Sequence, residues 1–204
     1  MLKIHTLPLG QLQANCYLVH AEGSKACAVI DPGGDYPILR AKLEALGLSV
    51  DAVLLTHGHF DHVGAVEELV EATGCQLWMS QSDWSQFPNP VTNYLYPMAN
   101  CDFTEVRFCE EGEIIPAGGL EFTVLQTPGH SHGSVCFACG DALFTGDTLF
   151  AGGMGRTDLP GGNGKFMGES LARLAEIEKN YTVYPGHGPA TTLATERSCN
   201  PYLR

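Results

Sequence analysis

Residues 56–62 read Thr-His-Gly-His-Phe-Asp-His and directly follow the apolar run at 52–55. Four side chains of this segment are common metal ligands: His57, His59, Asp61 and His62. Packing alone gains nothing from imidazoles and a carboxylate at such close spacing, whereas a bound ion would use all of them. Because the apolar run is typical of a short buried strand, we expect these ligands to lie in the loop where that strand ends.

Three further segments end an apolar run with a single histidine or aspartate beside glycine or proline. They are TPGH at 127–130, TGDT at 145–148 and YPGHG at 184–188. Glycine lets the backbone turn sharply at a strand end, so each segment can present one side chain to a shared site. Together with the first cluster they supply seven candidate ligands: His57, His59, Asp61, His62, His130, Asp147 and His187.

Seven ligands are too many for one zinc ion, which takes three protein ligands in catalytic sites and four in structural ones. They fit two adjacent ions that share a carboxylate. Such a centre lowers the pKa of a bound water, holds the resulting hydroxide as a nucleophile and polarises a carbonyl or phosphoryl oxygen. The sequence therefore predicts a hydrolase with two divalent ions per chain, zinc being the expected metal and iron or manganese the alternatives.

The composition excludes several other classes of protein. The 204 residues suit one domain over residues 1–204. With 11 basic and 23 acidic residues the net charge is −12, which disfavours nucleic acid as a partner. The first residues, 1–7, become polar too soon for a signal peptide, and no apolar stretch has the length of a membrane span. We expect a cytoplasmic protein with no membrane partner, and the sequence leaves its oligomeric state open.

Eight cysteines are expected to be free thiols, because a chain of this length without an export signal is unlike a small disulfide-stabilised domain. Cys136 and Cys139 have the spacing of a redox or zinc pair. They lie in a predicted strand, where side chains three residues apart point to opposite faces. We therefore expect no shared function for this pair.

Hydrophobic periodicity predicts an alternation of strands and helices. In the first part of the chain, strands are expected at 3–7, 16–20, 26–30 and 52–55, and helices at 36–46 and 63–72. Later strands are expected at 114–115, 120–126, 134–138, 142–145 and 182–184, with a helix at 166–178. Residues 81–100 are expected to form an irregular insertion. Two strand-rich parts, each closed by helices, favour two sheets sandwiched between helical layers.

Further motifs accompany the ligand segments along nearly the whole chain. They are NCYL at 15–18, VIDPGG at 29–34, GDTLF at 146–150, GRTD at 155–158 and PGHGP at 185–189, with ER at 196–197 and NP at 200–201. With these motifs the sequence resembles the metallo-β-lactamase superfamily, and within it the short, single-domain bacterial hydrolases of the glyoxalase II (hydroxyacylglutathione hydrolase) type. The resemblance implies an α/β fold, a four-layer αββα sandwich with the site at the edges of the sheets.

The resemblance also implies a role for each ligand. By analogy, a first metal is held by His57, His59 and His130, a second by Asp61, His62 and His187, and Asp147 bridges the two. Asp61 would in addition act in catalysis by orienting the metal-bridging hydroxide. The implied reaction is hydrolysis of a small-molecule thioester, S-lactoylglutathione or a related hydroxyacyl thioester. A thioester suits such a site because the thiolate leaves without a strong general acid.

Recognition of the substrate is less well marked in the sequence. Longer glyoxalase II enzymes carry a C-terminal helical extension that holds glutathione, and we expect none in this chain, which stops at Arg204. Arg156, and after it Lys165, are the positively charged candidates for binding a substrate carboxylate. The aromatic residues Trp78, Trp84, Phe87, Tyr94 and Tyr96 either line a substrate cleft or, as is more common, add to the local core.

Other activities compete with thioester hydrolysis. Persulfide dioxygenases of the same superfamily share the histidine-rich motif but use a single iron, for which His57, His130 and Asp147 would form the facial triad. A β-lactamase is disfavoured by the lack of an export signal, and a non-catalytic metal-binding module would require a blocked site. Asp31 and Asp158 are expected to anchor loops through hydrogen bonds, and His5, His20 and His132 to be ordinary surface or strand residues.

Overall fold

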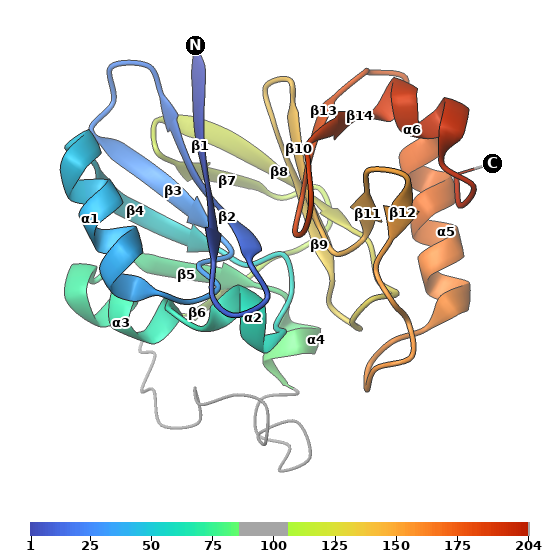
Figure 1. Cartoon of the computed structure of the whole chain (residues 1–204), viewed down its shortest axis with the longest axis horizontal. Coiled ribbons are helices and arrows are strands. Elements are labelled where there is room, and N and C mark those ends of the chain that lie inside the picture. The colour runs from blue at the N-terminus through green and yellow to red at the C-terminus, as the bar shows by residue number, and fades with distance from the viewer. Residues whose placement is uncertain (86–105, 204) are drawn as a thin grey trace.

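The computed structural model describes residues 1–85 and 106–203, which form two six-stranded sheets packed face to face with helices on both outer sides (Figure 1). The predicted insertion at 81–100 lies largely outside the described residues, as do Phe87, Tyr94 and Tyr96. Its first four residues form the short helix α4 (Gln81–Trp84). No helix of the described residues is both long and apolar enough to span a membrane.

The first sheet follows the order of the chain. Its strands are β1 (Leu2–Leu9), β2 (Ala14–Ala21), β3 (Ala26–Ile30), β4 (Ser49–Leu54), β5 (Gln76–Met79) and β6 (Val106–Phe108). The pairs β1–β2 and β2–β3 are antiparallel, and the remaining neighbours are parallel. Parallel neighbours need a crossover, which α1 (Tyr36–Leu46) supplies between β3 and β4. The carboxyl ends of β3 and β4 therefore lie at the same edge.

The second sheet has the order β14-β13-β10-β9-β8-β7. Its strands are β7 (Ile114–Ala117), β8 (Leu120–Gln126), β9 (Val135–Cys139), β10 (Ala142–Gly146), β13 (Thr182–Pro185) and β14 (Thr191–Thr192). Only β10 and β13 pair in parallel, and helix α5 (Gly164–Ala175) lies between them in the chain. A small hairpin of β11 (Leu149–Phe150) and β12 (Gly153–Met154) follows β10.

Three apolar clusters separate the four layers. Between the sheets, aromatic rings of Phe122, Phe137 and Phe144 are fully buried with Tyr17 beside them. The outer face of the first sheet packs against α1 and α3 (Val66–Thr73), and that of the second against α5 and α6 (Leu193–Cys199). The predicted four-layer αββα sandwich is thereby confirmed.

Most predicted elements are present, with differences that have a local cause. The helix expected at 63–72 is divided into α2 (Phe60–Val63) and α3, because the Ala65 amide donates to Pro32 O (2.9 Å) and so leaves the helical pattern. The later helix starts at Gly164 rather than 166, where the Asn163 side chain accepts from two backbone amides. Strands β5, β6, β11, β12 and β14 and helix α6 were not predicted.

The apolar clusters contain both tryptophans and the two cysteines of the 136/139 pair. Cys136 belongs to the cluster under α5 and Cys139 to the cluster between the sheets, so the two thiols face opposite sides of β9 as expected. The seven cysteines of the described residues are free. Trp78 is buried between the sheets, and Trp84 packs against the cluster under α1 and α3. These two rings belong to the core.

Removing one of the central rings should destabilise the sandwich. Phe144 is fully buried against the rings of Tyr17, Phe122 and Tyr184. We expect Phe144→Ala to lower the free energy of unfolding by about 3–5 kcal/mol. The matched control Phe166→Ala removes a ring that is 41% exposed and should cost less than about 1 kcal/mol. Urea unfolding at equal metal content measures both, and equal losses would contradict this view of the core.

Candidate metal centre

Strand ends from both sheets meet at one edge of the sandwich. Strand β4 leads through Thr56 to His57, while β8, β10 and β13 lead to His130, Asp147 and His187. Backbone hydrogen bonds join the two sheets here, from Val135 N to Thr56 O (2.8 Å) and from Asn15 N to Gly186 O (2.7 Å). Backbone contacts alone therefore join the two sheets at this edge, without a metal.

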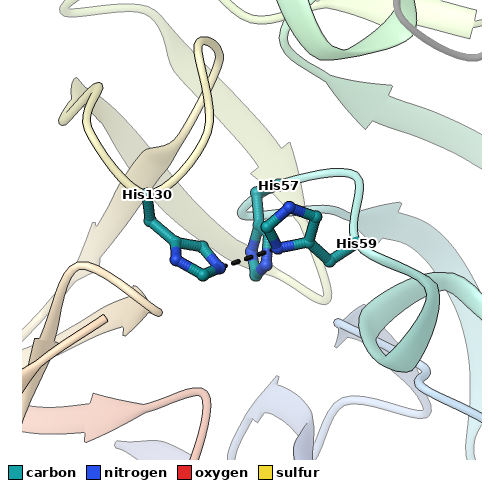
Figure 2. A group of neighbouring side chains, drawn as sticks. All are labelled: His57, His59 and His130. Carbon is teal, nitrogen blue, oxygen red and sulfur yellow. Dashed lines mark hydrogen bonds between the residues drawn. The ribbon is translucent and has the colours of Figure 1, made fainter. Parts of the chain in front are cut away.

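Three imidazoles form the first group of candidate ligands. One nitrogen from each of His57, His59 and His130 lies within 4.8 Å of the others. His59 and His57 come from the loop after β4 and His130 from the opposite sheet, and Figure 2 shows the three rings turned toward one another. The His59 Nδ1 and His130 Nε2 atoms are 2.7 Å apart. The fold thus brings together residues that are 71 positions apart in the chain.

The surroundings of His57 and His59 favour neutral imidazoles. Burial lowers the pKa of His57 far below its usual range, and the neighbouring histidines lower it further. Burial, followed by the charge of His130, lowers the pKa of His59 to about 4. Neutral imidazole is the form that binds a metal, because the ring nitrogen then keeps its lone pair.

The second group combines two histidines and a carboxylate. Ligand atoms of Asp61, His62 and His187 also lie within 4.8 Å of one another. His187 Nε2 is 3.1 Å from Asp61 Oδ2, and His62 Nε2 is 3.7 Å from the same oxygen. The hydrogen bond with Asp61 raises the pKa of His187. Burial opposes ionisation of Asp61, but that hydrogen bond and the charge of His62 outweigh it and lower the pKa of the carboxyl.

The Asp147 carboxylate lies between the two groups. Its Oδ1 is 3.4 Å from His62 Nε2, and its Oδ2 is 3.4 Å from His130 Nε2 and 3.7 Å from His187 Nε2. Burial alone would raise the pKa of this carboxyl, but the charge of His62, together with the charges of His130 and His187, lowers it to about 2. Asp147 is therefore an ionised carboxylate that reaches both groups.

Three of the candidate ligand atoms are buried with no hydrogen-bond partner among the described residues: His57 Nε2, His62 Nε2 and Asp147 Oδ1. Buried polar atoms are normally paired, so three such atoms at one site require an explanation. A divalent cation would satisfy all of them, and imidazole with carboxylate is a donor set that suits zinc, iron or manganese. The residues present therefore fit a divalent metal.

The second ring nitrogen of each buried histidine is held by a neighbour. His57 Nδ1 is 3.0 Å from Thr56 Oγ1, which in turn donates to Asp31 Oδ2 (2.6 Å). His62 Nδ1 lies 2.9 Å from the same Asp31 oxygen, and His130 Nδ1 donates to Arg156 O (2.7 Å). These contacts fix the tautomers and leave Nε2 of each ring for a metal. Asp31 anchors its loop as predicted, but its hold on His62 was not predicted.

The loop that carries His187 is held from the first sheet. Asn15 Nδ2 donates to Pro185 O (3.0 Å) and Gly188 O (2.9 Å), and the Tyr17 hydroxyl donates to Pro185 O (2.5 Å). Sequence reasoning missed these roles, because residues 15–18 were noticed only as part of a family motif. Their signal was an asparagine and a tyrosine in the mainly apolar strand β2.

Arg156 lies at the surface beside this centre. Its guanidinium donates to Asp158 through Nε (2.7 Å, to Oδ1) and Nη2 (2.7 Å, to Oδ2), and its side chain is 62% exposed. Asp158 thus makes the hydrogen bonds predicted for it, with Arg156 as the partner. His5 and His20 pair with each other through their Nε2 atoms (3.3 Å) on a different part of the first sheet.

The fold and the histidine–aspartate cluster define a metal-binding αββα sandwich. The family model of the Metallo-beta-lactamase superfamily matches residues 9–187, and the chain belongs to this superfamily. Over 209 residues it is 34% identical to hydroxyacylglutathione hydrolase GloC of Haemophilus influenzae, with 99% of this chain and 98% of that protein covered.

Solved structures extend the comparison. TTHA1623 in a di-iron-bound form is 40% identical, with a TM-score of 0.84 and coverage of 98% of this chain and 100% of that one. The B3 metallo-beta-lactamase BLEG-1 is 32% identical, with a TM-score of 0.86 and coverage of 100% and 99%. ETHE1 from Myxococcus xanthus is 29% identical, with a TM-score of 0.80 and coverage of 98% and 83%.

Gly186 packs directly against two candidate ligands, Asp147 and His62. A Cβ at this position would lie 2.2 Å from Asp147 Oδ1 and 2.7 Å from His62 Cε1. Gly186→Ala should displace this carboxylate and weaken metal binding about 10–100-fold. Metal retained after dialysis against a weak chelator measures the loss. The control Gly168→Ala adds a Cβ in α5 that meets no other described residue within 4 Å, apart from its chain neighbours and its own helix backbone. Equal metal retention by both variants would contradict the assigned geometry.

Proposed function

We propose that this protein is a dinuclear metal-dependent hydrolase of a thioester, with S-lactoylglutathione or a related hydroxyacyl thioester as substrate. Membership of the superfamily supports a metallo-hydrolase. The position of Asp147, with one oxygen 3.4 Å from His62 and the other 3.4 Å from His130, carries the proposal of two metals. A carboxylate so placed is suited to bridge two ions.

In this proposal the first ion is held by His57, His59 and His130, the second by Asp61, His62 and His187, and Asp147 contacts both. Two bound divalent ions would supply an activated water as nucleophile and polarise the thioester carbonyl. The seven side chains come from both sheets, so the site depends on the complete sandwich.

The protein's own residues prepare this chemistry. Asp61 is ionised, and the hydrogen bond from His187 to its Oδ2 holds the carboxylate at the second group of candidate ligands. There it can orient the proton of an attacking water. Asp31 and Thr56 hold the Nδ1 atoms of His62 and His57, so that Nε2 of each ring faces the site. A thiolate is a good leaving group, so no strong general acid is required.

Two properties of the chain support a small thioester as the substrate. GloC, which is named a hydroxyacylglutathione hydrolase, is 34% identical to this chain over nearly the full length of both proteins. A net charge of −12 disfavours a phosphate-backbone substrate. A small thioester therefore suits this chain better than a nucleic acid.

Hydrolysis of S-lactoylglutathione by the zinc-loaded protein tests this proposal. We expect turnover, and we expect Asp147→Ala to lower kcat/KM at least about 100-fold because both ions lose their shared ligand. The control Asp141→Ala removes a carboxylate that is 90% exposed at the surface and should keep full activity. Full activity of Asp147→Ala would contradict the bridging role. A β-lactam belongs in the same assay because of the similarity to BLEG-1.

A single-iron persulfide dioxygenase is the second candidate. The similarity to ETHE1 keeps this alternative open. His57, His130 and Asp147 would be the ligands, and His130 Nε2 lies 3.4 Å from Asp147 Oδ2. Oxygen uptake with glutathione persulfide, with one iron per chain and no thioester hydrolysis, would favour this function over the first.

Arg156 is proposed to bind a carboxylate of the substrate. Its exposed guanidinium is held in place by Asp158, and its backbone carbonyl contacts His130. Arg156→Ala should raise KM about two- to fivefold with little change in kcat, as expected for an exposed charge. The control Lys165→Ala removes the other candidate cation, which is 80% exposed beside Glu169, and should have a smaller effect. A loss confined to kcat would argue against substrate binding by Arg156.

A further inference from the structure

A buried carboxylate outside the candidate ligands connects the segments that carry the three-histidine group. Asp83 lies in α4 and is 4% exposed. Its Oδ2 accepts hydrogen bonds from Gly58 N (2.8 Å) and Ser131 Oγ (2.8 Å), and its Oδ1 accepts one from Gly133 N (2.6 Å). Three donors therefore converge on a carboxylate that can only accept, and ionised aspartate is the side chain that matches them.

The positions of these donors link Asp83 to the metal centre. Gly58 lies between His57 and His59, so fixing its amide limits the orientation of both imidazoles. Ser131 directly follows His130, and its hydroxyl is also 2.7 Å from Ser134 Oγ. One carboxylate thus joins the loop after β4 to the loop between β8 and β9. These two loops carry all three imidazoles of the first group.

Gly133 packs closely against Asp83 and Ser80, so only a residue without a side chain fits at this position. A Cβ on Gly133 would lie 2.4 Å from Ser80 Oγ and 2.7 Å from Asp83 Oδ1. The Ser80 hydroxyl accepts a hydrogen bond from Ser82 N (3.1 Å) and so caps the helix that carries Asp83. The cap consequently fixes the helix that carries Asp83, and the three donors fix its carboxylate.

We propose that Asp83 is a positioning residue for the three-histidine group. Asp83 sets the separation of the two loops and thereby the metal affinity of that group. The inference rests on the proposed metal ligands and goes beyond them. None of the hydrogen-bond partners of Asp83 is the side chain of a candidate ligand. Partners of this kind typically change metal affinity 10–100-fold when they are removed.

Asp83→Asn tests the proposal with almost no change in volume. The amide keeps one acceptor oxygen but presents an NH2 group to a donor, so at least one of the Gly58 and Gly133 amides loses its partner. We expect the affinity of the first group for zinc to fall about 10–100-fold. The affinity of the second group, with Asp61 and His187, should stay within about threefold, because its ligands do not touch Asp83.

The measurement is metal content per chain after equilibration with a graded series of chelator concentrations, together with the absorption spectrum of the cobalt-loaded protein. His59→Ala and His187→Ala provide reference spectra for loss of a ligand from the first and second groups. The spectrum of Asp83→Asn should resemble that of His59→Ala. Thermal unfolding of each variant separates a loss of stability from a change at the site.

Glu196→Gln is the matched control. Glu196 is 2% exposed and accepts from three donors, Gly152 N (2.8 Å), Thr191 Oγ1 (2.7 Å) and Asn200 Nδ2 (2.8 Å). It is therefore a carboxylate of the same kind that touches neither histidine loop. Its variant should lower the melting temperature to a similar extent and keep the wild-type affinity of the first group.

A second variant covers the case in which Asp83→Asn does not fold. Ser131→Ala removes a single hydrogen bond to Asp83 and should weaken the first group about two- to tenfold. Wild-type affinity of the first group in Asp83→Asn, or in Ser131→Ala if the former is unfolded, would overturn the proposal. Equal weakening of both groups would do the same. Failure of the wild-type protein to bind two ions would instead overturn the proposed dinuclear function.

Discussion

The Asp147 carboxylate is the constraint around which this sandwich is organised. It is a buried negative charge flanked by imidazoles from three other chain segments, and its Oδ1 has no hydrogen-bond partner in the described residues. Burial of such a group is costly unless positive charge is brought to it. The protonated form is disfavoured here, since the neighbouring histidines lower the pKa to about 2. A cation between the loops resolves this conflict.

The scaffold meets this constraint mainly through its backbone. Gly33, Gly146 and Gly186 have no room for a side chain, because a Cβ would lie within 2.2 Å of Asp61 O, Thr56 Oγ1 and Asp147 Oδ1 respectively. Loops from the two sheets can therefore approach until their ligands converge. Polar side chains then fix the loops in register, as the contacts of Asn15 with the His187 loop and of Asp83 with both histidine loops illustrate.

The layers, and the convergence of the loops that carry the candidate ligands, could be predicted because their signals are local. Apolar runs that end in His or Asp beside glycine mark the ligand loops, and periodicity marks the longer elements, so α1 was predicted with its observed bounds. The supporting contacts could not be predicted, because Asp83 and Gly133 are 50 residues apart and Asn15 and Pro185 are 170 apart. In both contacts the partner is a backbone atom, and the residue type gives no sign of such a contact. The four residues of β5 are too few to establish a period.

Anomalous diffraction from crystals of the metal-loaded protein tests whether Asp147 is shared by two ions, because it counts the ions and places them without reference to activity. We expect two peaks per chain, one among His57, His59 and His130 and one among Asp61, His62 and His187, with Asp147 in contact with both. A single peak at His57, His130 and Asp147, or peaks away from Asp147, would contradict this expectation.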